Sequence, residues 1–456
     1  MIIERIKSEG IAHLSYFLGS EREAVVIDPR RDCQVYLDLA QQKEMNIKYI
    51  FETHRNEDFV IGSVELAHLT QAKIFHGPGL DFKYGERLKD GQDFVFGVLK
   101  LTAIHTPGHT PESMSYILRD LTAGEEPVMV FTGDALFVGD VGRTDFNGSG
   151  SAEKLYDSIF NKILNLGDSV ILCPAHGAGS ICGSSISKRE HSTLGLERVQ
   201  NPVLQKKSKE DFIKFKDAEH HELPPYFRKM EEYNLNGPPL LDHLPTPSPL
   251  SPQTFQGWMK QGAMIVDTRM PPDFGAAYIK GSYNIWLDGL PTFAGWVLSY
   301  DTPILLVVED RAHINQAVRS LIRLGYDQII GYLYRGVEAW YNKALPIEQL
   351  GLLTAQELKN RLDQGDEFVL LDVRDNEEWE DGHIEDVLHI YVGHLEERLN
   401  EVPRDRRIMV VCGTGERASL GASILRREGY YEVYNLLGGM TAWKNAEYPL
   451  VRSRSP

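Results

Sequence analysis

The chain has 456 residues, of which 42% are hydrophobic and 25% are charged, and these values are typical of globular proteins and exclude wholesale disorder. Its 48 Lys and Arg residues stand against 65 Asp and Glu residues, which gives a formal net charge of −17. Such a surface repels nucleic-acid phosphates and anionic lipids, so we expect neither nucleic-acid nor membrane binding. The length predicts about three domains.

The N-terminus and the cysteine content indicate where the protein works. The start, MIIERIKSEG, lacks the apolar core of a signal peptide, and the longest apolar runs, such as 304–308, are too short to span a membrane. Four cysteines cannot form a disulfide framework in a chain of this length. We therefore expect a cytoplasmic protein.

Residues 1–237 alternate short apolar runs with polar turns, which is typical of an α/β fold. The runs at 24–27, 49–51, 128–131 and 170–172 have the composition of buried strands. Functional side chains of α/β sheets collect in the loops beyond the strand ends. Four turns carry histidine or aspartate there, at 53–59, 105–111, 131–137 and 173–177.

These four turns predict a metal site. Each of them places a possible ligand beside Gly, Pro or Thr, where the side chain can point to a shared centre. A single histidine among 15 is more often a packed or exposed residue, but four such turns in succession favour metal binding. The residues that could take part are His54, Asp58, His105, His109, Asp134 and His176.

The order of these motifs over residues 1–200 resembles the metallo-β-lactamase superfamily, which implies an αββα sandwich. The family's usual first motif, Thr-His-x-His-x-Asp-His, supports two metals, whereas Asn56 and Phe59 occupy two of its histidine positions here. Neither side chain can supply the nitrogen that a second metal needs. His54, His109 and Asp134 remain, and two imidazoles with one carboxylate form the facial triad of non-haem Fe(II) oxygenases, which leaves three coordination positions open. A two-zinc hydrolase needs a second cation.

The run Gly142-Arg143-Thr144-Asp145-Phe146 resembles the persulfide dioxygenase branch of this superfamily, which is close to the glyoxalase II thioesterases. In that branch iron is held by residues that map onto His54, His109 and Asp134, and a persulfide is oxidised by dioxygen to sulfite and the free thiol. The resemblance places Arg143 near the iron, where a guanidinium could stabilise anionic sulfur or oxygen. Alternatively, Arg143 and Asp145 only pin a loop through an ion pair.

Four further residues of this region are expected to lie around the predicted site. Asp58 and His105 are expected to be hydrogen-bonding partners of the ligands rather than ligands. His176 could be either. Cys182 is expected to pack in the core, and the alternative is a supporting role beside the metal ligands.

A Pro-rich segment, 238–253, separates residues 1–237 from a duplicated region. Residues 238–252 hold six of the 23 prolines, and because proline fixes φ and lacks an N–H donor, the segment is predicted to be an extended linker. The sequence then repeats at an offset of 103 to 105 residues, which predicts two α/β domains with parallel sheets at 254–346 and 352–452. A capping box at Thr354-Ala-Gln-Glu357 opens the second copy.

Cys412 follows a predicted strand and precedes a glycine-containing loop that enters a helix. Loop amides and a helix N-terminus stabilise a thiolate, so we expect the pKa of this cysteine to fall below about 8.5. With flanking motifs around Arg374, His383 and Trp443, residues 352–450 resemble the rhodanese sulfurtransferases. The resemblance implies that Cys412 carries a sulfane sulfur. The residues expected to hold it are Arg417 and the loop residues Gly413, Thr414, Gly415 and Glu416.

The first copy has Glu309 where Cys412 stands, and a carboxylate cannot carry a sulfane sulfur. We expect this copy to be catalytically silent and to serve packing or orientation. The whole layout resembles bacterial fusions of a metallo-β-lactamase-like persulfide dioxygenase with an inactive and an active rhodanese.

Such an enzyme would take O2 and a thiol persulfide, made from glutathione, coenzyme A, cysteine or another thiol, and release sulfite. The rhodanese could pass a second sulfur to sulfite and give thiosulfate, so that sulfide-derived persulfides are removed. We expect one Fe(II) per chain and a homo-oligomer. Two alternatives remain: a zinc-dependent thioesterase-type hydrolase fused to the sulfurtransferase, and a non-catalytic scaffold that presents persulfide to Cys412.

Overall fold

The structure is a computed structural model, and it describes residues 1–145, 150–183, 185–206, 208–219 and 222–452. The chain divides into two compact units. The first contains Met1–Leu244 together with Ile322–Gly325, and the second contains Pro245–Leu321 and the chain from Tyr326 onwards. Within the described ranges, no helix combines the length and the apolar character needed to cross a lipid bilayer.

The first unit contains twelve of the strands and the first six α-helices of the described chain. The strands are β1 (Ile2–Ser8), β2 (His13–Ser20), β3 (Glu23–Ile27), β4 (Asn46–Phe51), β5 (Lys73–His76), β6 (Glu86–Arg87), β7 (Gln92–Phe96), β8 (Leu99–His105), β9 (Met114–Asp120), β10 (Met129–Gly133), β11 (Ile171–Pro174) and β12 (Ser192–Thr193). The helices are α1 (Gln34–Gln42), α2 (Ser63–Thr70), α3 (Ser151–Ser158), α4 (Leu194–Gln200), α5 (Lys209–Asp217) and α6 (Phe227–Asn236), with the short helices η1 (Ile159–Ile163) and η2 (Leu164–Leu166).

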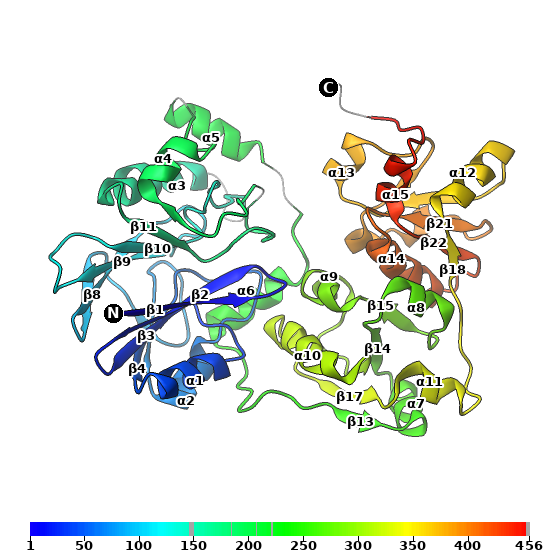
Figure 1. The fold of residues 1–456 in the computed structure, drawn as a ribbon, viewed down its shortest axis with the longest axis horizontal. Coiled ribbons are helices and arrows are strands. Elements are labelled where there is room, and N and C mark those ends of the chain that lie inside the picture. The colour runs from blue at the N-terminus through cyan, green and yellow to red at the C-terminus, as the bar shows by residue number, and fades with distance from the viewer. Residues whose placement is uncertain (146–149, 184, 207, 220–221, 453–456) are drawn as a thin grey trace. The chain divides into compact units, whose positions relative to one another are not determined.

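These elements form an αββα sandwich of two six-stranded sheets, which confirms the predicted fold (Figure 1). The strand order is β1-β2-β3-β4-β5-β6 in one sheet and β12-β11-β10-β9-β8-β7 in the other. The strands predicted at 24–27, 49–51, 128–131 and 170–172 correspond to β3, β4, β10 and β11. Figure 1 shows the layers in order, from α3, α4 and α5 through the two sheets to α1 and α2.

The alternating direction of the side chains along β2 explains how the layers of the sandwich pack together. All eight residues of β2 are buried, and successive side chains of a strand point to opposite faces. Leu14, Tyr16 and Leu18 therefore enter the core between the two sheets, where many of the buried aromatic rings gather. Phe17 faces the other way and packs with Tyr36 of α1. Burial on both faces holds this strand rigidly beside the loops of the site.

The second unit consists of two five-stranded sheets whose neighbouring strands are all parallel. The first copy contains β13 (Ser248–Leu250), α7 (Pro252–Lys260), β14 (Met264–Asp267), α8 (Pro271–Ala276), β15 (Ser282–Asn284), η3 (Leu287–Gly289), α9 (Leu290–Val297), β16 (Ile304–Val307), η4 (Arg311–His313), α10 (Ile314–Arg323), β17 (Ile329–Leu333) and α11 (Gly336–Tyr341). The second contains β18 (Gly351–Leu353), α12 (Ala355–Gln364), β19 (Val369–Asp372), α13 (Asn376–Asp381), β20 (Leu388–His389), η5 (Val392–His394), η6 (Leu399–Glu401), β21 (Ile408–Val411), α14 (Glu416–Arg427), β22 (Val433–Leu436) and α15 (Gly439–Asn445).

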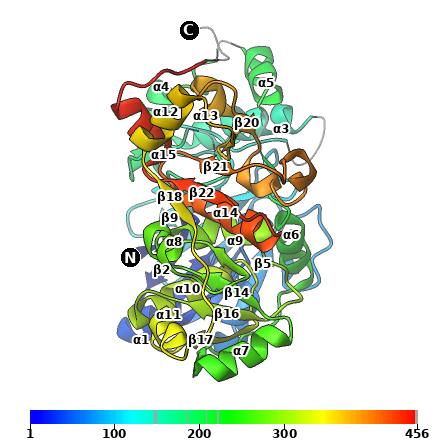
Figure 2. The ribbon, with the colours of Figure 1, turned by 90° about the vertical axis from the view of Figure 1, so that its right-hand side faces the viewer.

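The two copies share one topology, with the orders β13-β17-β16-β14-β15 and β18-β22-β21-β19-β20, and Figure 2 shows both sheets with their helices. This confirms the duplicated α/β fold that the repeat predicted. The capping box at Thr354 and Glu357 is present at the start of α12. One segment differs from the predicted linker: β13 lies within 238–253 and pairs with β17. It is an edge strand of its sheet, and such a strand tolerates a proline within it, here Pro249.

The same ion pair recurs in both copies. Arg269 binds Asp267 through two nitrogens, with an Nη2 to Oδ2 distance of 2.6 Å. Arg374 binds Asp372 in the same way, again at 2.6 Å. Both aspartates are fully buried at the ends of strands. The pair is kept in the copy without a cysteine, so its contacts support the fold rather than sulfur chemistry.

Candidate functional site

The metal-site candidates of the first unit meet where four strands end. His54 follows β4, His109 lies in the loop after β8, Asp134 follows β10, and His176 follows β11. Gly133 ends β10 with a φ of +55°, and a Cβ on it would lie 2.7 Å from the Cβ of Thr53. This close approach of two strand ends requires glycine.

His54, His109 and Asp134 form a group that could hold one metal ion. The Asp134 Oδ2 atom lies 3.7 Å from His54 Nε2 and 3.6 Å from His109 Nε2, and all three side chains are buried. Both Nε2 atoms lack a hydrogen-bond partner, although buried polar atoms are almost always paired. Bonds of about 2.0–2.2 Å are usual for metals held by imidazole and carboxylate, and a cation between these atoms would satisfy both orphaned nitrogens. The residues present therefore fit a metal.

Each histidine of this group is oriented through its other ring nitrogen. Thr53 donates its hydroxyl to Asp28 Oδ2 at 2.7 Å, so its oxygen is free to accept a hydrogen bond from His54 Nδ1 at 2.9 Å. His109 Nδ1 donates to the carbonyl oxygen of Arg143 at 2.9 Å. Such partners fix the ring and the tautomer, and leave the Nε2 lone pair for a metal.

Burial and charge set the protonation of this group. Burial lowers the pKa of His54 to about 3 and also lowers the pKa of His109, so both rings are neutral near pH 7. Burial alone would raise the pKa of Asp134, but His176, His54 and His109 hold it well below its usual value. The site thus offers two neutral imidazoles and one carboxylate.

Asp58 and His176 lie together behind Asp134. His176 Nδ1 donates to Asp134 Oδ1 at 2.8 Å, and its Nε2 lies 3.0 Å from Asp58 Oδ2. Between these two carboxylates the pKa of His176 rises well above its ordinary value, although burial opposes the shift. His105 is not part of the centre, because its Nε2 bonds to the carbonyl of Pro111.

A second group of possible ligands contains a residue that the sequence did not single out for this role. Cys182 lies with Asp58 and His176, and their ligand atoms are all within 4.8 Å of one another. Phe59 is fully buried and packs on the ring of His13 with centroids 4.1 Å apart. Asn56 points its amide to the carbonyl of His54. The two replaced histidine positions are therefore filled by packing and by a backbone contact.

Glu57 is a buried acid of the site that the motif alone did not reveal. It is 1% exposed, its Oε2 lies 3.8 Å from His109 Nε2, and neither carboxylate oxygen has a hydrogen-bond partner. Burial raises the pKa of Glu57 well above its usual value. The sequence feature that could have identified Glu57 is its position inside the 53–59 turn.

Arg143 is held by the ion pair that the sequence offered as one of its two roles. Its Nε and Nη2 atoms bind Asp145 Oδ1 and Oδ2, each at 2.7 Å, and the side chain is 1% exposed. Its positive charge helps to lower the pKa of His109, so the guanidinium also favours the neutral form of this candidate metal ligand. Phe146 of the same motif lies outside the described residues.

Cys412 directly follows β21 and is fully buried. The Gly415 N–H donates to its Sγ at 3.0 Å, and Gly439, with a φ of +48°, lets the next loop approach the Cys412 carbonyl. Burial raises the pKa of the Cys412 thiol, and the charge of Arg417 and the N–H groups of the loop only partly offset this effect. The expected low pKa is therefore wrong for this conformation.

Arg417 makes a two-point ion pair beside this loop. Its Nη1 and Nη2 atoms bind Glu378 Oε2 and Oε1 at 2.5 and 2.7 Å. The four loop residues Gly413, Thr414, Gly415 and Glu416 run from Cys412 into α14, and Thr414 donates its hydroxyl to Glu416. In the first copy, Glu309 stands at the equivalent position and is exposed, whereas Cys412 is fully buried.

The family models that match this chain cover its two units separately. Residues 9–176 match the metallo-beta-lactamase superfamily, and residues 251–343 and 354–446 match the rhodanese-like domain. The mitochondrial persulfide dioxygenase ETHE1 of Bos taurus is 34% identical over 213 residues, which is 44% of this chain and 75% of that protein. The hydroxyacylglutathione hydrolase GloC of Haemophilus influenzae is 29% identical over 216 residues, which is 42% of this chain and 93% of that protein.

A solved structure covers more of the chain. The crystal structure of a metallo-beta-lactamase from Staphylococcus aureus subsp. aureus COL aligns with a TM-score of 0.65 at 30% identity. It covers 73% of this chain and 98% of that one. The alignment therefore extends beyond the first unit into the rhodanese-like region.

Proposed function

The chain belongs to the metallo-beta-lactamase superfamily, among the relatives of persulfide dioxygenase, and carries two rhodanese-like domains, and from this we propose that it oxidises a thiol persulfide and transfers sulfane sulfur. The oxidation is R–S–SH + O2 + H2O → R–SH + SO3²⁻ + 2 H⁺. The observation that carries the proposal is the buried group of His54, His109 and Asp134, with two orphaned Nε2 atoms. Glutathione, coenzyme A and cysteine are the candidate carriers R–SH.

We propose one Fe(II) per chain, held by these three side chains. Bound there, it would supply the activation of dioxygen, which no side chain can perform. Two neutral imidazoles and one carboxylate are the donor set of non-haem Fe(II) oxygenases, which leaves coordination positions for substrate and dioxygen. The surrounding residues keep the centre dry, because His54, Asp134 and Glu57 are at most 3% exposed.

The neighbouring side chains position this donor set. Thr53 and the Arg143 carbonyl fix the two rings, and protonated His176 holds the Asp134 carboxylate. We assign the Arg143 guanidinium to the stabilisation of anionic sulfur or oxygen, since a buried cation with a fork geometry suits such groups. Its pairing with Asp145 holds the fork in place.

The second step of the proposal uses Cys412. Its thiolate attacks the outer sulfur of a persulfide, so that a Cys412–S–SH forms and R–S⁻ leaves. Sulfite then takes that sulfur, which restores the Cys412 thiolate and gives thiosulfate. Amides of the loop 413–416 and the charge of Arg417 support the anionic sulfur. Two active sites on one chain raise the effective concentration of the shared intermediate, which suits removal of sulfide-derived persulfides.

Two variants test the assignment of the oxidation to the metal group and of sulfur transfer to Cys412. With glutathione persulfide and O2, we expect the Cys412→Ser variant to keep its oxygen uptake and to accumulate sulfite in place of thiosulfate. The Asp134→Ala variant should lose oxygen uptake, while Cys412 still transfers sulfur from persulfide to added sulfite. Thiosulfate formation at the full rate by Cys412→Ser would refute the role of Cys412, and full oxygen uptake by Asp134→Ala would refute the metal site.

A hydrolase is the second candidate, and two observations favour it. The hydrolase GloC matches the first unit, and Asp58, His176 and Cys182 form a further group of possible ligands beside the first. A thioesterase would cleave a glutathione thioester without oxygen. Anaerobic hydrolysis that is lost in Asp134→Ala, together with no aerobic oxygen uptake on any persulfide, would favour this candidate.

A further inference from the structure

Arg417 and Glu378 form an ion pair that lies against the first residue of the Cys412 loop. The Arg417 Nη1 and Nη2 atoms bind Glu378 Oε2 and Oε1 at 2.5 and 2.7 Å. A Cβ on Gly413 would lie 3.2 Å from Arg417 Nη2 and 3.7 Å from Glu378 Oε1. Since Gly413 directly follows Cys412, the charges of this pair act at short range on the Cys412 sulfur.

The start of α13 places Glu378 beside Arg417. Asp375 caps this helix, because its Oδ1 accepts a hydrogen bond from the backbone N–H of Glu378 at 2.8 Å. Arg374 donates through Nη1 to the carbonyl oxygen of Glu378 at 2.9 Å. These two contacts hold the backbone of Glu378, so its carboxylate meets Arg417 in a defined geometry. Asp375 Oδ2 lies farther from Arg417, at 3.8 Å from Nη1.

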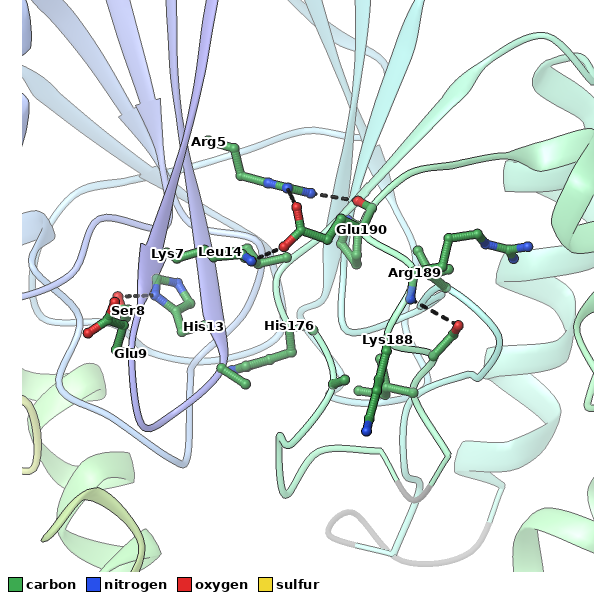
Figure 3. A pocket seen from close by; sticks show the side chains of 17 residues that line it. Arg5, Lys7, Ser8, Glu9, His13, Leu14, His176, Lys188, Arg189 and Glu190 are labelled. Carbon is green, nitrogen blue, oxygen red and sulfur yellow. Dashed lines mark hydrogen bonds and ion pairs between the residues drawn. The ribbon is translucent and has the colours of Figure 1, made fainter. Parts of the chain in front are cut away.

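The partial burial of this pair strengthens it relative to a pair on the protein surface. In Figure 3, Glu190 of the first unit binds both Arg5 and Lys7. The Glu190 and Lys7 side chains are about half exposed, and water screens the charges of such pairs. The Arg417 and Glu378 side chains are only 19% and 35% exposed. Glu378 therefore offsets much of the Arg417 charge.

The first copy of the duplicated domain keeps the acid of this pair but lacks its cation. Asp273 accepts from Arg269 Nη1 through its carbonyl oxygen at 3.2 Å, which is the contact that Glu378 makes in the second copy. Ile314 takes the place of Arg417, since each lies five residues after the equivalent positions 309 and 412. The Arg417–Glu378 pair therefore accompanies the cysteine, unlike the Arg–Asp pair that both copies keep.

The charged groups that face Cys412 come from α13 and from the start of α14. Burial raises the pKa of the Cys412 thiol, and Arg417 opposes this rise. Burial would also raise the pKa of Glu378, but its bonds to Arg417 and Asp375 hold it well below the usual value, so Glu378 is ionised near pH 7. Burial and Glu378 raise the pKa of Asp375 to about 6. Glu416 is the acid at the first position of α14, and the loop between β22 and α15 adds no charged side chain.

We propose that Glu378 is a positioning residue that sets the reactivity of Cys412 through Arg417. By binding both Nη groups, the carboxylate takes up charge that would otherwise stabilise the thiolate, and so keeps the resting sulfur protonated and less reactive. The inference rests on the proposed function, in which Cys412 carries the sulfane sulfur. Glu378 would protect this carrier from unspecific electrophiles and oxidants between turnovers.

The pH dependence of Cys412 alkylation tests the proposal in the full chain. Iodoacetamide is the probe, and mass spectrometry follows the peptide that contains Cys412. We expect Glu378→Gln to move the midpoint of the profile down by about 1 pH unit, because Arg417 then acts on the sulfur without a competing carboxylate. At pH 7 the thiolate fraction should rise about tenfold and the rate only about threefold, since a thiolate of lower pKa is a weaker nucleophile. Glutamine keeps the size of the side chain, and circular dichroism checks the fold.

Two controls isolate the effect that acts through Arg417. Glu377→Gln removes a neighbouring exposed acid of the same helix and should leave the profile unchanged. In an Arg417→Met background, Glu378→Gln should move the midpoint by less than half as much, because only the direct effect of its charge remains. Equal shifts for the two glutamine variants, an unmoved or raised midpoint for Glu378→Gln, or a full shift without Arg417 would each overturn the proposal.

This test is independent of the proposed sulfur transfer, because iodoacetamide reacts with a thiolate without any sulfur donor. If the unmodified chain forms no thiosulfate from persulfide and sulfite, the proposed transfer is refuted. A profile that shifts as described would even then support the control of Cys412 by Glu378, and an unshifted profile would overturn it.

Discussion

Replacing Thr53 by valine removes a single hydroxyl from the metal centre and keeps the shape of the side chain. That hydroxyl donates to Asp28 at 2.7 Å and accepts from His54 Nδ1 at 2.9 Å. The change therefore leaves one buried donor and one buried acceptor short of a partner, while the backbone N–H of residue 53 still binds Asp28. Thr53 itself is 1% exposed, so water cannot easily replace the lost contacts.

The magnitude follows from these two contacts. Each unpaired buried group costs about 1–3 kcal/mol, so we expect the free energy of unfolding to fall by at least about 2 kcal/mol. The His54 ring loses the bond that orients it, and loss of such a partner typically weakens metal binding about 10- to 100-fold. Competition with a chromophoric chelator measures the affinity, and urea unfolding measures the stability.

The matched control is Thr53→Ser, which keeps the hydroxyl and removes only a methyl group. We expect it to bind metal nearly as tightly as the unmodified chain. Equal metal affinity in the valine and serine variants would refute the reasoning, because it would show that the His54 ring needs no partner at Nδ1.

Two further predictions concern the second unit. Burial raises the pKa of the Cys412 thiol and Arg417 lowers it, so the rate of Cys412 alkylation by iodoacetamide, measured by mass spectrometry, should still be increasing above pH 9. Arg417→Met should move this pH–rate profile to higher pH. A profile that levels off below pH 8 would contradict this prediction. The side chain of Asn284 accepts from the Ser419 hydroxyl of α14 at 2.5 Å and donates to the carbonyl of Asp267 at 3.0 Å. Asn284→Ala should therefore lower the stability of this unit by about 2–4 kcal/mol and slow sulfur transfer. Asn342→Ala at an exposed position should change neither in urea unfolding and transfer assays.

The sequence predicted most of the architecture because periodicity and duplication are local signals. The strands before His54, Asp134 and His176, and the repeat that relates Arg269 to Arg374, could be recognised from short runs of residues. The meeting of His54, His109 and Asp134 could be predicted because these residues lie in turns that directly follow strands. These features require no knowledge of which distant side chains touch.

Contacts between distant segments could not be predicted in this way. Cys182 meets Asp58 although 124 positions separate them in the chain, and His13 packs on Phe59, which lies 46 positions further along. The pKa of Cys412 was expected to be low because a loop and a helix N-terminus favour a thiolate. The thiol is fully buried, and the desolvation that burial brings depends on packing, which the local motif does not report.

The metal content of the purified chain tests the central claim most directly. Protein expressed without added metal is analysed by mass spectrometry of the elements, alongside Asp134→Ala as the variant that should lose the ion. We predict one iron per chain and almost none in the variant. Two zinc ions per chain would contradict the account, since a second cation would place Asp58, His176 and Cys182 in a two-metal hydrolase site.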